Sequence, residues 1–184
     1  KRRYFLPPPI RSDVEAAARD SSVESWSKEA SRRPAPEKNG DVASVRKFVT
    51  CCARITEEKN VLDGFVRLME LIGAERMKRR GLVPMLFGRK TSPSYSEECV
   101  ARLMAAFPEK GACEIHDFGG PAEMANMWSQ TRLNLHSSLY ESYGMVPIEA
   151  AAFSVPTLCH TGRVIGFCDL LLEKDGEVFR TDFV

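Results

Sequence analysis

The stretch Leu82-Val83-Pro84-Met85-Leu86-Phe87, followed by Gly88, decides the fold class of this chain. Its residues are apolar without the alternation of a half-exposed strand, which is typical of a parallel strand covered on both faces. Similar short runs recur and alternate with stretches in which apolar residues have helical spacing. The predicted strands are 48–53, 82–87, 112–116, 133–136, 155–159 and one that begins at 178; the predicted helices are 61–72, 97–107, 122–131, 146–153 and 165–172. This alternation predicts an α/β fold, a Rossmann-like parallel sheet with helices on both faces.

Residues 1–44 differ in composition from the rest of the chain. Pro7-Pro8-Pro9 favours extended backbone, and residues 11–41 are rich in Ser, Glu, Ala, Arg, Lys and Pro with few large apolar side chains. We therefore predict that 1–44 includes a polar, mobile insertion and that 45–184 forms the folded domain. Because the sequence starts at Lys1 and not at a methionine, we interpret it as a piece of a longer chain.

The charge balance excludes partners that need a strong electrostatic field. The chain has 26 basic and 25 acidic residues, for a formal net charge of +1, which gives no support for binding to nucleic acid or to a membrane surface. We interpret the local clusters Lys1-Arg2-Arg3 and Lys78-Arg79-Arg80 as solvated surface. No apolar stretch approaches the ~20 residues that a transmembrane helix needs.

The cysteines and the missing nucleotide motifs narrow the chemistry further. None of the six cysteines forms a CxxC pair, and the three histidines do not have metal-ligand spacing with them. We therefore expect reduced thiols, no metal site and a reducing, cytoplasmic environment. The chain contains neither GxGxxG nor GxxxxGK[ST], which disfavours ordinary dinucleotide binding and P-loop chemistry.

In an open parallel sheet, ligands bind outside the carboxyl ends of the strands, so the loops that follow strands are the places to search. The first such loop runs from Arg54, directly after a strand, to Lys59, just before a helix. Two cations that converge on a helix N-terminus suit a diphosphate, because the backbone N–H groups and the helix dipole add to their field. The alternative is a charged surface loop in which Lys59 pairs with Glu57 or Glu58.

The second loop, His136-Ser137-Ser138-Leu139-Tyr140-Glu141-Ser142-Tyr143-Gly144, leads into a helix that carries another carboxylate at Glu149. Gly144 allows a positive φ or a close backbone approach at the turn, and Pro147 suits the first helical turn. Glu149 precedes Ala150-Ala151-Ala152, so its carboxylate lies beside a small-residue face and needs a hydrogen-bonding partner such as sugar hydroxyls. The alternative is a helix whose Glu149 points to solvent.

The third loop, His116-Asp117-Phe118-Gly119-Gly120-Pro121, is a turn after a strand. It offers backbone groups and an aromatic ring to a nucleotide base. An ordinary Gly-Pro turn is the alternative.

Together these loops resemble the retaining glycosyltransferases of family four, in the C-terminal domain of their two-domain, B-type fold. The resemblance covers about residues 45–184, and the pair of glutamates in its context is its most specific part. The matching segments are Arg54-x4-Lys59-Asn60, Phe87-Gly88, the turn at 116–119, Glu141-x7-Glu149 in the setting Ser138 to Gly144, and Val155-Pro156-Thr157. Phe5-Leu6-Pro7-Pro8 resembles the segment by which such chains leave their N-terminal domain.

The resemblance implies a role for each matching residue. Arg54 and Lys59 would hold the nucleotide diphosphate and offset charge on the leaving group in place of a metal. The helix start at Gly144-Met145-Val146 would donate N–H groups to the same diphosphate. Glu149 would accept hydrogen bonds from the ribose, and Glu141 from the donor sugar.

The remaining matches complete the expected nucleotide-sugar site. The loop of His116, Asp117 and Phe118 would meet the base, and Gly88 and Ser138 would line the site. The sequence departs from the family's pattern in two places. His160-Thr161-Gly162-Arg163 stands where the family often has a Gly-Gly loop, and Ser142-Tyr143 replaces the commoner Gly-Phe.

The sequence is therefore interpreted as the donor-binding domain of a retaining glycosyltransferase that moves a sugar from a UDP- or GDP-sugar to an acceptor hydroxyl, without metal or other cofactor. Residues 1–44 would then include a linker from a missing N-terminal acceptor domain, and we expect no activity without that domain. Any contact with the cytosolic face of a membrane would be made by the missing part. The alternatives are a non-catalytic nucleotide-sugar-binding or assembly module of the same fold, and a sugar-nucleotide epimerase.

Overall fold

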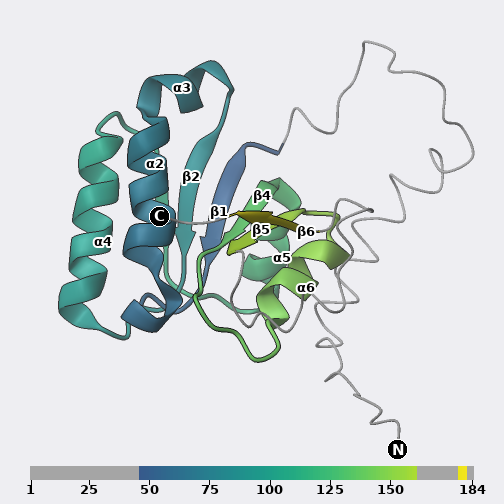
Figure 1. The fold of residues 1–184 in the computed structure, drawn as a ribbon. Helices are drawn as coiled ribbons and strands as arrows, with labels where there is room; N and C mark the ends of the chain where they lie inside the picture. Colours follow the sequence, from purple (N-terminus) through teal and green to yellow (C-terminus); the bar gives the residue numbers. More distant parts are fainter. Residues whose placement is uncertain (1–45, 161–177, 182–184) are drawn as a thin grey trace, which may run out of the picture.

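The computed structural model describes residues 46–160 and 178–181, which form a single parallel sheet flanked by helices. The strand order is β3-β2-β1-β4-β5-β6, and every neighbouring pair is parallel (Figure 1). The strands are β1 (Phe48–Cys52), β2 (Val83–Phe87), β3 (Glu114–His116), β4 (Thr131–His136), β5 (Thr157–His160) and β6 (Val178–Thr181). The predicted Rossmann-like α/β fold is confirmed.

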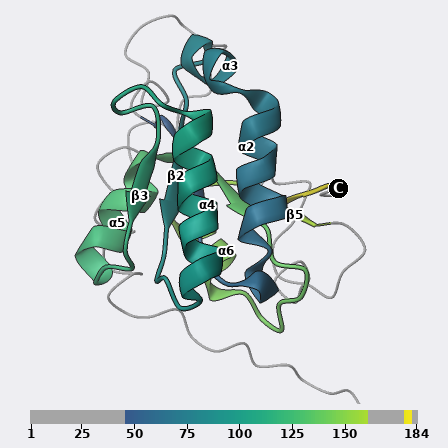
Figure 2. The ribbon, with the colours of Figure 1, turned by 90° about the vertical axis from the view of Figure 1, so that its left-hand side faces the viewer.

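Helices cover both faces of the sheet: those from the first part of the domain lie on one face, and those from the later part lie on the other. Figure 2 shows α2 and α4 side by side in front of one face, whereas α5 and α6 lie behind the sheet. The helical elements are η2 (Glu57–Lys59, a 3₁₀ turn), η3 (Val61–Val66, a π-helical segment), α2 (Arg67–Ile72), α3 (Ala74–Arg79), α4 (Pro93–Ala106), α5 (Pro121–Gln130) and α6 (Met145–Ala152). None of the helices in the described part of the chain is long and apolar enough to cross a bilayer.

The central strand β1 explains why the apolar runs are continuous. All of its residues are buried. Val49 and Cys51 pack into the cluster beneath α2 and α4, and Phe48 and Cys52 pack into the cluster beneath α5 and α6. Because successive side chains of a strand point to opposite faces, a strand covered on both sides is buried at every position and mostly apolar.

The predicted elements agree with the structure except at some ends. Helix α4 begins earlier than predicted, at Pro93, because proline suits the first turn. The helix predicted to reach Thr131 ends at Gln130. Thr131 instead begins β4, where its buried Oγ1 lies 2.8 Å from both the Met127 carbonyl and Thr50 Oγ1. The short helix α3 was not predicted. The helix predicted at 165–172 and the linker and insertion predicted in 1–44 lie outside the described residues.

The strand order reverses between β1 and β4. The chain moves from β1 to β2 and β3 on one side, then crosses to β4, β5 and β6 on the other. Loops that follow β1 and β4 therefore leave the same edge of the sheet as neighbours and diverge, which opens a crevice where ligands bind in open α/β sheets. The candidate residues in 54–60 and 136–144 meet at this point.

Candidate functional site

The loops after β1 and β4 are held together by a buried serine. Ser137 Oγ donates to the Lys59 carbonyl oxygen at 2.8 Å. A Cβ on Gly64 would lie 2.6 Å from Ser137 Cβ, so only glycine allows η3 to pack this closely on the end of β4. Lys59 and the residues that follow β4 therefore have a fixed relative position.

Lys59 and Glu141 form an ion pair at the centre of this arrangement. Lys59 Nζ donates to Glu141 Oε2 at 2.8 Å, and each side chain is only 18% exposed. Lys59 therefore pairs with Glu141 and not with Glu57 or Glu58, the alternative considered from the sequence. A cation and a carboxylate from loops 82 residues apart converge at the crevice.

His136 lies under this pair at the end of β4. Its Nε2 is 3.7 Å from Glu141 Oε2, and its side chain is buried. Burial lowers the pKa of His136 from 6.5 to about 4; Glu141 raises this pKa and Lys59 lowers it, but burial is the largest effect. The imidazole is therefore neutral at neutral pH, and Glu141 faces one full positive charge, on Lys59.

Arg54 pairs with a different carboxylate. Its Nη2 donates to Glu58 Oε1 at 2.6 Å, and both side chains are about 60% exposed, at 59% and 61%. Arg54 and Lys59 thus each have a carboxylate partner of their own. An exposed pair of this kind contributes only ~0–1 kcal/mol, so Arg54 is released from Glu58 at little cost.

The start of α6 presents backbone N–H groups four residues after Glu141 in the chain. Gly144 precedes the helix with φ 82° and ψ 71°, a left-handed conformation that favours glycine. No side chain caps this end of the helix. The amides of Met145 and Val146 belong to the first turn, which has no intrahelical acceptor for its N–H groups. Such a helix start is suited to an anion.

Glu149 is buried in α6, as expected from its apolar surroundings, with 4% of its surface exposed. Its charge contributes to the environment of Cys52. The pKa of the Cys52 thiol is raised well above its usual value by burial, then by Cys51 and by Glu149. Ser138, 1% exposed, lies in the loop before Glu141, and its Oγ has no hydrogen-bond partner among the described residues.

The third loop forms an aromatic hollow at the end of β2 and β3. The rings of Phe87 and His116 have centroids 6.3 Å apart, and those of Phe87 and Phe118 are 6.0 Å apart. His116 and Asp117 line a cavity of about 280 Å³ between this edge of the sheet and α5. Phe118 is 40% exposed, so its ring is accessible to a planar ligand.

Gly88 has a structural reason that the sequence did not reveal. A Cβ at this position would lie 1.7 Å from the Ala53 carbonyl oxygen, because the chains leaving β1 and β2 continue closely side by side there. The Gly88 N–H donates to the His116 carbonyl at 2.9 Å, which ties this close approach to the third loop. Gly88 thus fixes the spacing between the first and third loops.

Sequence reasoning did not identify Ser137, Gly64 or the role of His136. A glycine inside a helical apolar pattern was the available signal for Gly64, since such residues often mark close packing. The partner of Ser137 is set by strand order, which no local pattern reveals. Within the described residues, no group of three or more His, Cys, Asp or Glu side chains is placed to hold a metal ion.

Comparisons with known proteins show which folds resemble this one. No protein-family model matches the chain, and no curated protein matches it. Among solved structures, HepE from Anabaena in complex with UDP and glucose is 16% identical with a TM-score of 0.56, over 76% of this chain and 35% of that one. WaaG, a glycosyltransferase involved in lipopolysaccharide biosynthesis, is 17% identical with a TM-score of 0.60, over 98% and 44%.

A third solved structure corresponds to a separate domain. The C-terminal domain of LpcC, a group 1 glycosyltransferase from Francisella tularensis, is 15% identical with a TM-score of 0.56, over 79% of this chain and 76% of that one. The chain thus spans less than half of HepE and of WaaG but most of the LpcC domain. At these identities the likeness establishes the fold: a Rossmann-like domain of the kind found in B-type glycosyltransferases.

Proposed function

We propose that this chain is the donor-binding domain of a retaining, family-four glycosyltransferase that transfers a sugar from a UDP- or GDP-sugar to an acceptor hydroxyl. The observation that carries the proposal is the meeting of Lys59 and Glu141 at 2.8 Å, with Glu141 in the loop that leads into the uncapped start of α6. A cation and a helix start suit a diphosphate, and a carboxylate suits sugar hydroxyls. The complexes of HepE with UDP and with UDP-glucose support the same ligand class.

The diphosphate would bind between Lys59 and the first turn of α6. Negative charge grows on the diphosphate as its bond to the sugar breaks, and preorganised donors stabilise that charge. Lys59 supplies a full charge from a position fixed by Ser137, and the amides of Met145 and Val146 supply dipoles. Arg54 would add a second charge after leaving Glu58. These groups take the role that a metal ion has in other transferases.

The two glutamates would bind different parts of the donor. Glu149, buried in α6, would accept hydrogen bonds from the ribose. Glu141 would exchange Lys59 for sugar hydroxyls when the donor arrives, because Lys59 then turns to the phosphates. The aromatic hollow at Phe87, His116 and Phe118 would hold the base. The resemblance stated above supports this division.

Calorimetry on the 184-residue chain with UDP and GDP, each with and without a chelator, tests the donor site. We expect weak binding of a nucleoside diphosphate that the chelator does not change. Loss of binding in chelator would contradict the metal-free site, and absence of binding by every nucleotide would contradict the proposal.

We further propose that transfer needs a second domain, because a donor and an acceptor must be held between two facing walls. A turnover assay of this chain alone with a UDP- or GDP-sugar should therefore show no transfer. A non-catalytic binding module of the same fold would give the same result for this chain. An assay of a longer chain that includes the second domain distinguishes the two possibilities. That longer protein should transfer the sugar if the proposal is correct, and should bind the nucleotide sugar without transfer if the chain is a non-catalytic module.

A further inference from the structure

A second surface of interest is the half of the sheet that α2 and α4 do not cover. Leu135, Leu158 and Phe179 are register partners across β4, β5 and β6 and share one face of the sheet; Leu135 is buried in the cluster beneath α2 and α4, and the row continues beyond α2 at Leu158 and Phe179. Figure 2 shows β5 beyond the edge of α2. Phe179 is 47% exposed. Parallel sheets are normally covered on both faces, so an apolar row of this kind calls for a covering element.

A groove runs along this face beside α2. Its volume is about 460 Å³, and its apolar lining includes Leu68 and Ile72 from α2 and Leu133, Leu135 and Leu158 from the sheet. The groove is therefore a strip of apolar surface with one helical wall.

The rim of the groove is cationic. Arg76 and Arg80, at α3, and Arg132, at the start of β4, also line it. None of the three forms an ion pair with any carboxylate in the described ranges 46–160 and 178–181. Lys78, on the same helix, does have such a partner, Glu109 at 2.9 Å. Arg79 lines an adjoining hollow together with Arg76 and Arg80 but does not line the groove.

We propose that this groove binds an amphipathic helix whose apolar face is flanked by acidic residues. A helix placed beside α2 at the usual 8–10 Å interaxial distance would cover the leucines of β4 and β5 and complete the helical layer. Its carboxylates would pair with Arg76, Arg80 and Arg132, whose guanidinium groups suit bidentate contacts. The charge of the rim therefore selects the partner.

Two other occupants fit the groove less well. A second copy of this chain that paired through the same face would bring the arginine rims of both copies together, and like charges across an interface disfavour association. An anionic bilayer would attract the arginines, but its flat surface does not reach leucines at the floor of a groove. A ridge of side chains on a helix does reach them.

Two synthetic peptides of about 18 residues serve as probes, a length that gives measurable helix in water. Both carry the same leucine stripe at i, i+3, i+4 and i+7, flanked by glutamates in one peptide and by lysines in the other. Fluorescence anisotropy with the full chain should show binding of the glutamate peptide and at least about tenfold weaker binding of the lysine peptide.

Charge reversal on the protein supplies the matched control. Arg80→Glu and Arg132→Glu should each weaken binding of the glutamate peptide about tenfold, whereas Arg79→Glu, on the same helix but outside the groove, should change it less than about threefold. All three arginines are exposed, and a melting curve for each variant checks that it is folded.

Several outcomes would overturn the proposal. They are failure of both peptides to bind, equal binding of the two peptides, or equal effects of Arg80→Glu and Arg79→Glu. If analytical sedimentation shows a dimer of the wild-type chain and Arg132→Glu abolishes that dimer, the groove is assigned to a second copy of the chain. A further test is sedimentation of the protein together with phosphatidylglycerol vesicles. If it sediments with them and the glutamate peptide does not release it, the arginines are assigned to a membrane.

Discussion

Replacing Glu141 by glutamine removes the carboxylate that holds Lys59 and leaves the size of the side chain almost unchanged. If the diphosphate and Glu141 compete for Lys59, Glu141→Gln should strengthen the binding of free UDP or GDP, whichever the chain binds. The same substitution should weaken binding of the corresponding sugar nucleotide relative to the free diphosphate, because the amide replaces a carboxylate that meets the sugar.

The structure sets the size of this effect. The pair has one contact at 2.8 Å, and both side chains are 18% exposed. Its value should therefore lie at or just above the upper end of the ~0–1 kcal/mol measured for fully exposed pairs. Releasing ~1 kcal/mol of competition corresponds to roughly fivefold tighter binding of the free diphosphate.

Isothermal titration of UDP and GDP into the wild-type chain and the variant measures this change. Glu58→Gln is the matched control, because it breaks the Arg54 pair, which has a similar distance of 2.6 Å but 59% and 61% exposed side chains. The control should change affinity by less than about twofold. Weaker binding of the free diphosphate by Glu141→Gln would refute competition for Lys59.

Three further predictions concern binding and stability. Glu149→Ala should weaken binding of the free diphosphate and of the sugar nucleotide alike, by roughly ten- to a hundredfold in titrations. A melting curve of the variant separates an effect on binding from an effect on folding. Gly88→Ala should destabilise the fold by ~3 kcal/mol or more in urea unfolding, because its Cβ would lie 1.7 Å from the Ala53 backbone oxygen, whereas Gly120→Ala meets only a side-chain oxygen at 3.1 Å and should be mild. His136 has a folded pKa of about 4 against 6.5, so the unfolded state binds more protons between these values and stability should fall by ~2–3 kcal/mol from pH 7 to pH 4.5. A His136→Gln variant should lose that pH dependence, and an unchanged profile would contradict this assignment.

Local sequence patterns predicted most of the elements because burial on both faces makes a strand continuously apolar. The runs at β1 and β2 were visible for this reason, and their burial in the structure agrees. Helix α3 was missed for the opposite reason. It follows Gly73, whose φ is 79°, and only Met77 among its residues is buried, so it carries no apolar stripe to detect.

The candidate site was predictable in its parts but not in its pairings. Lys59 and Glu141 were each selected from a loop that follows a strand, but their contact depends on β4 lying beside β1. Strand order is a global property that short-range periodicity does not encode. Arg54 is the opposite case: its partner Glu58 lies only four residues away, so this pair does not depend on strand order.

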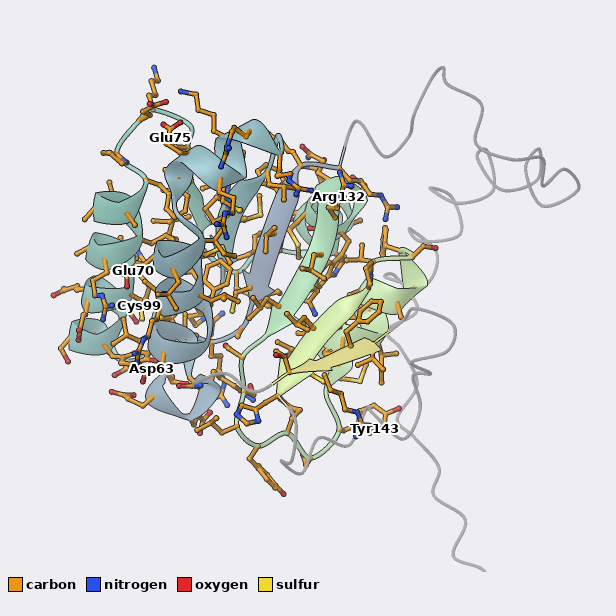
Figure 3. The ribbon with its side chains drawn as sticks, turned by 45° about the horizontal axis from the view of Figure 1, so that its top comes forward. Asp63, Glu70, Glu75, Cys99, Arg132 and Tyr143 are labelled. Carbon is orange, nitrogen blue, oxygen red and sulfur yellow. The ribbon has the colours of Figure 1, made fainter. Side chains whose placement is uncertain are left out.

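The nucleotide site and the arginine rim of the groove should act independently, because Arg132 lies near the start of β4 and the Lys59–Glu141 pair lies beyond its end. Figure 3 shows Arg132 and Tyr143 at opposite ends of the molecule. Arg132 and His136 lie near the two ends of β4, four residues apart, which at ~3.3 Å per residue is roughly 13 Å. That separation exceeds the Debye length of ~8 Å at physiological salt, so exposed charges at one site are largely screened from the other.

Independence is measurable in a double variant. Arg80→Glu should leave diphosphate affinity unchanged, Glu141→Gln should leave peptide affinity unchanged, and the two changes should add in the combined chain within ~0.5 kcal/mol. A larger deviation would mean that the sheet transmits a change from one edge to the other. The groove would then have to be treated as a regulator of the donor site and not as a separate docking surface.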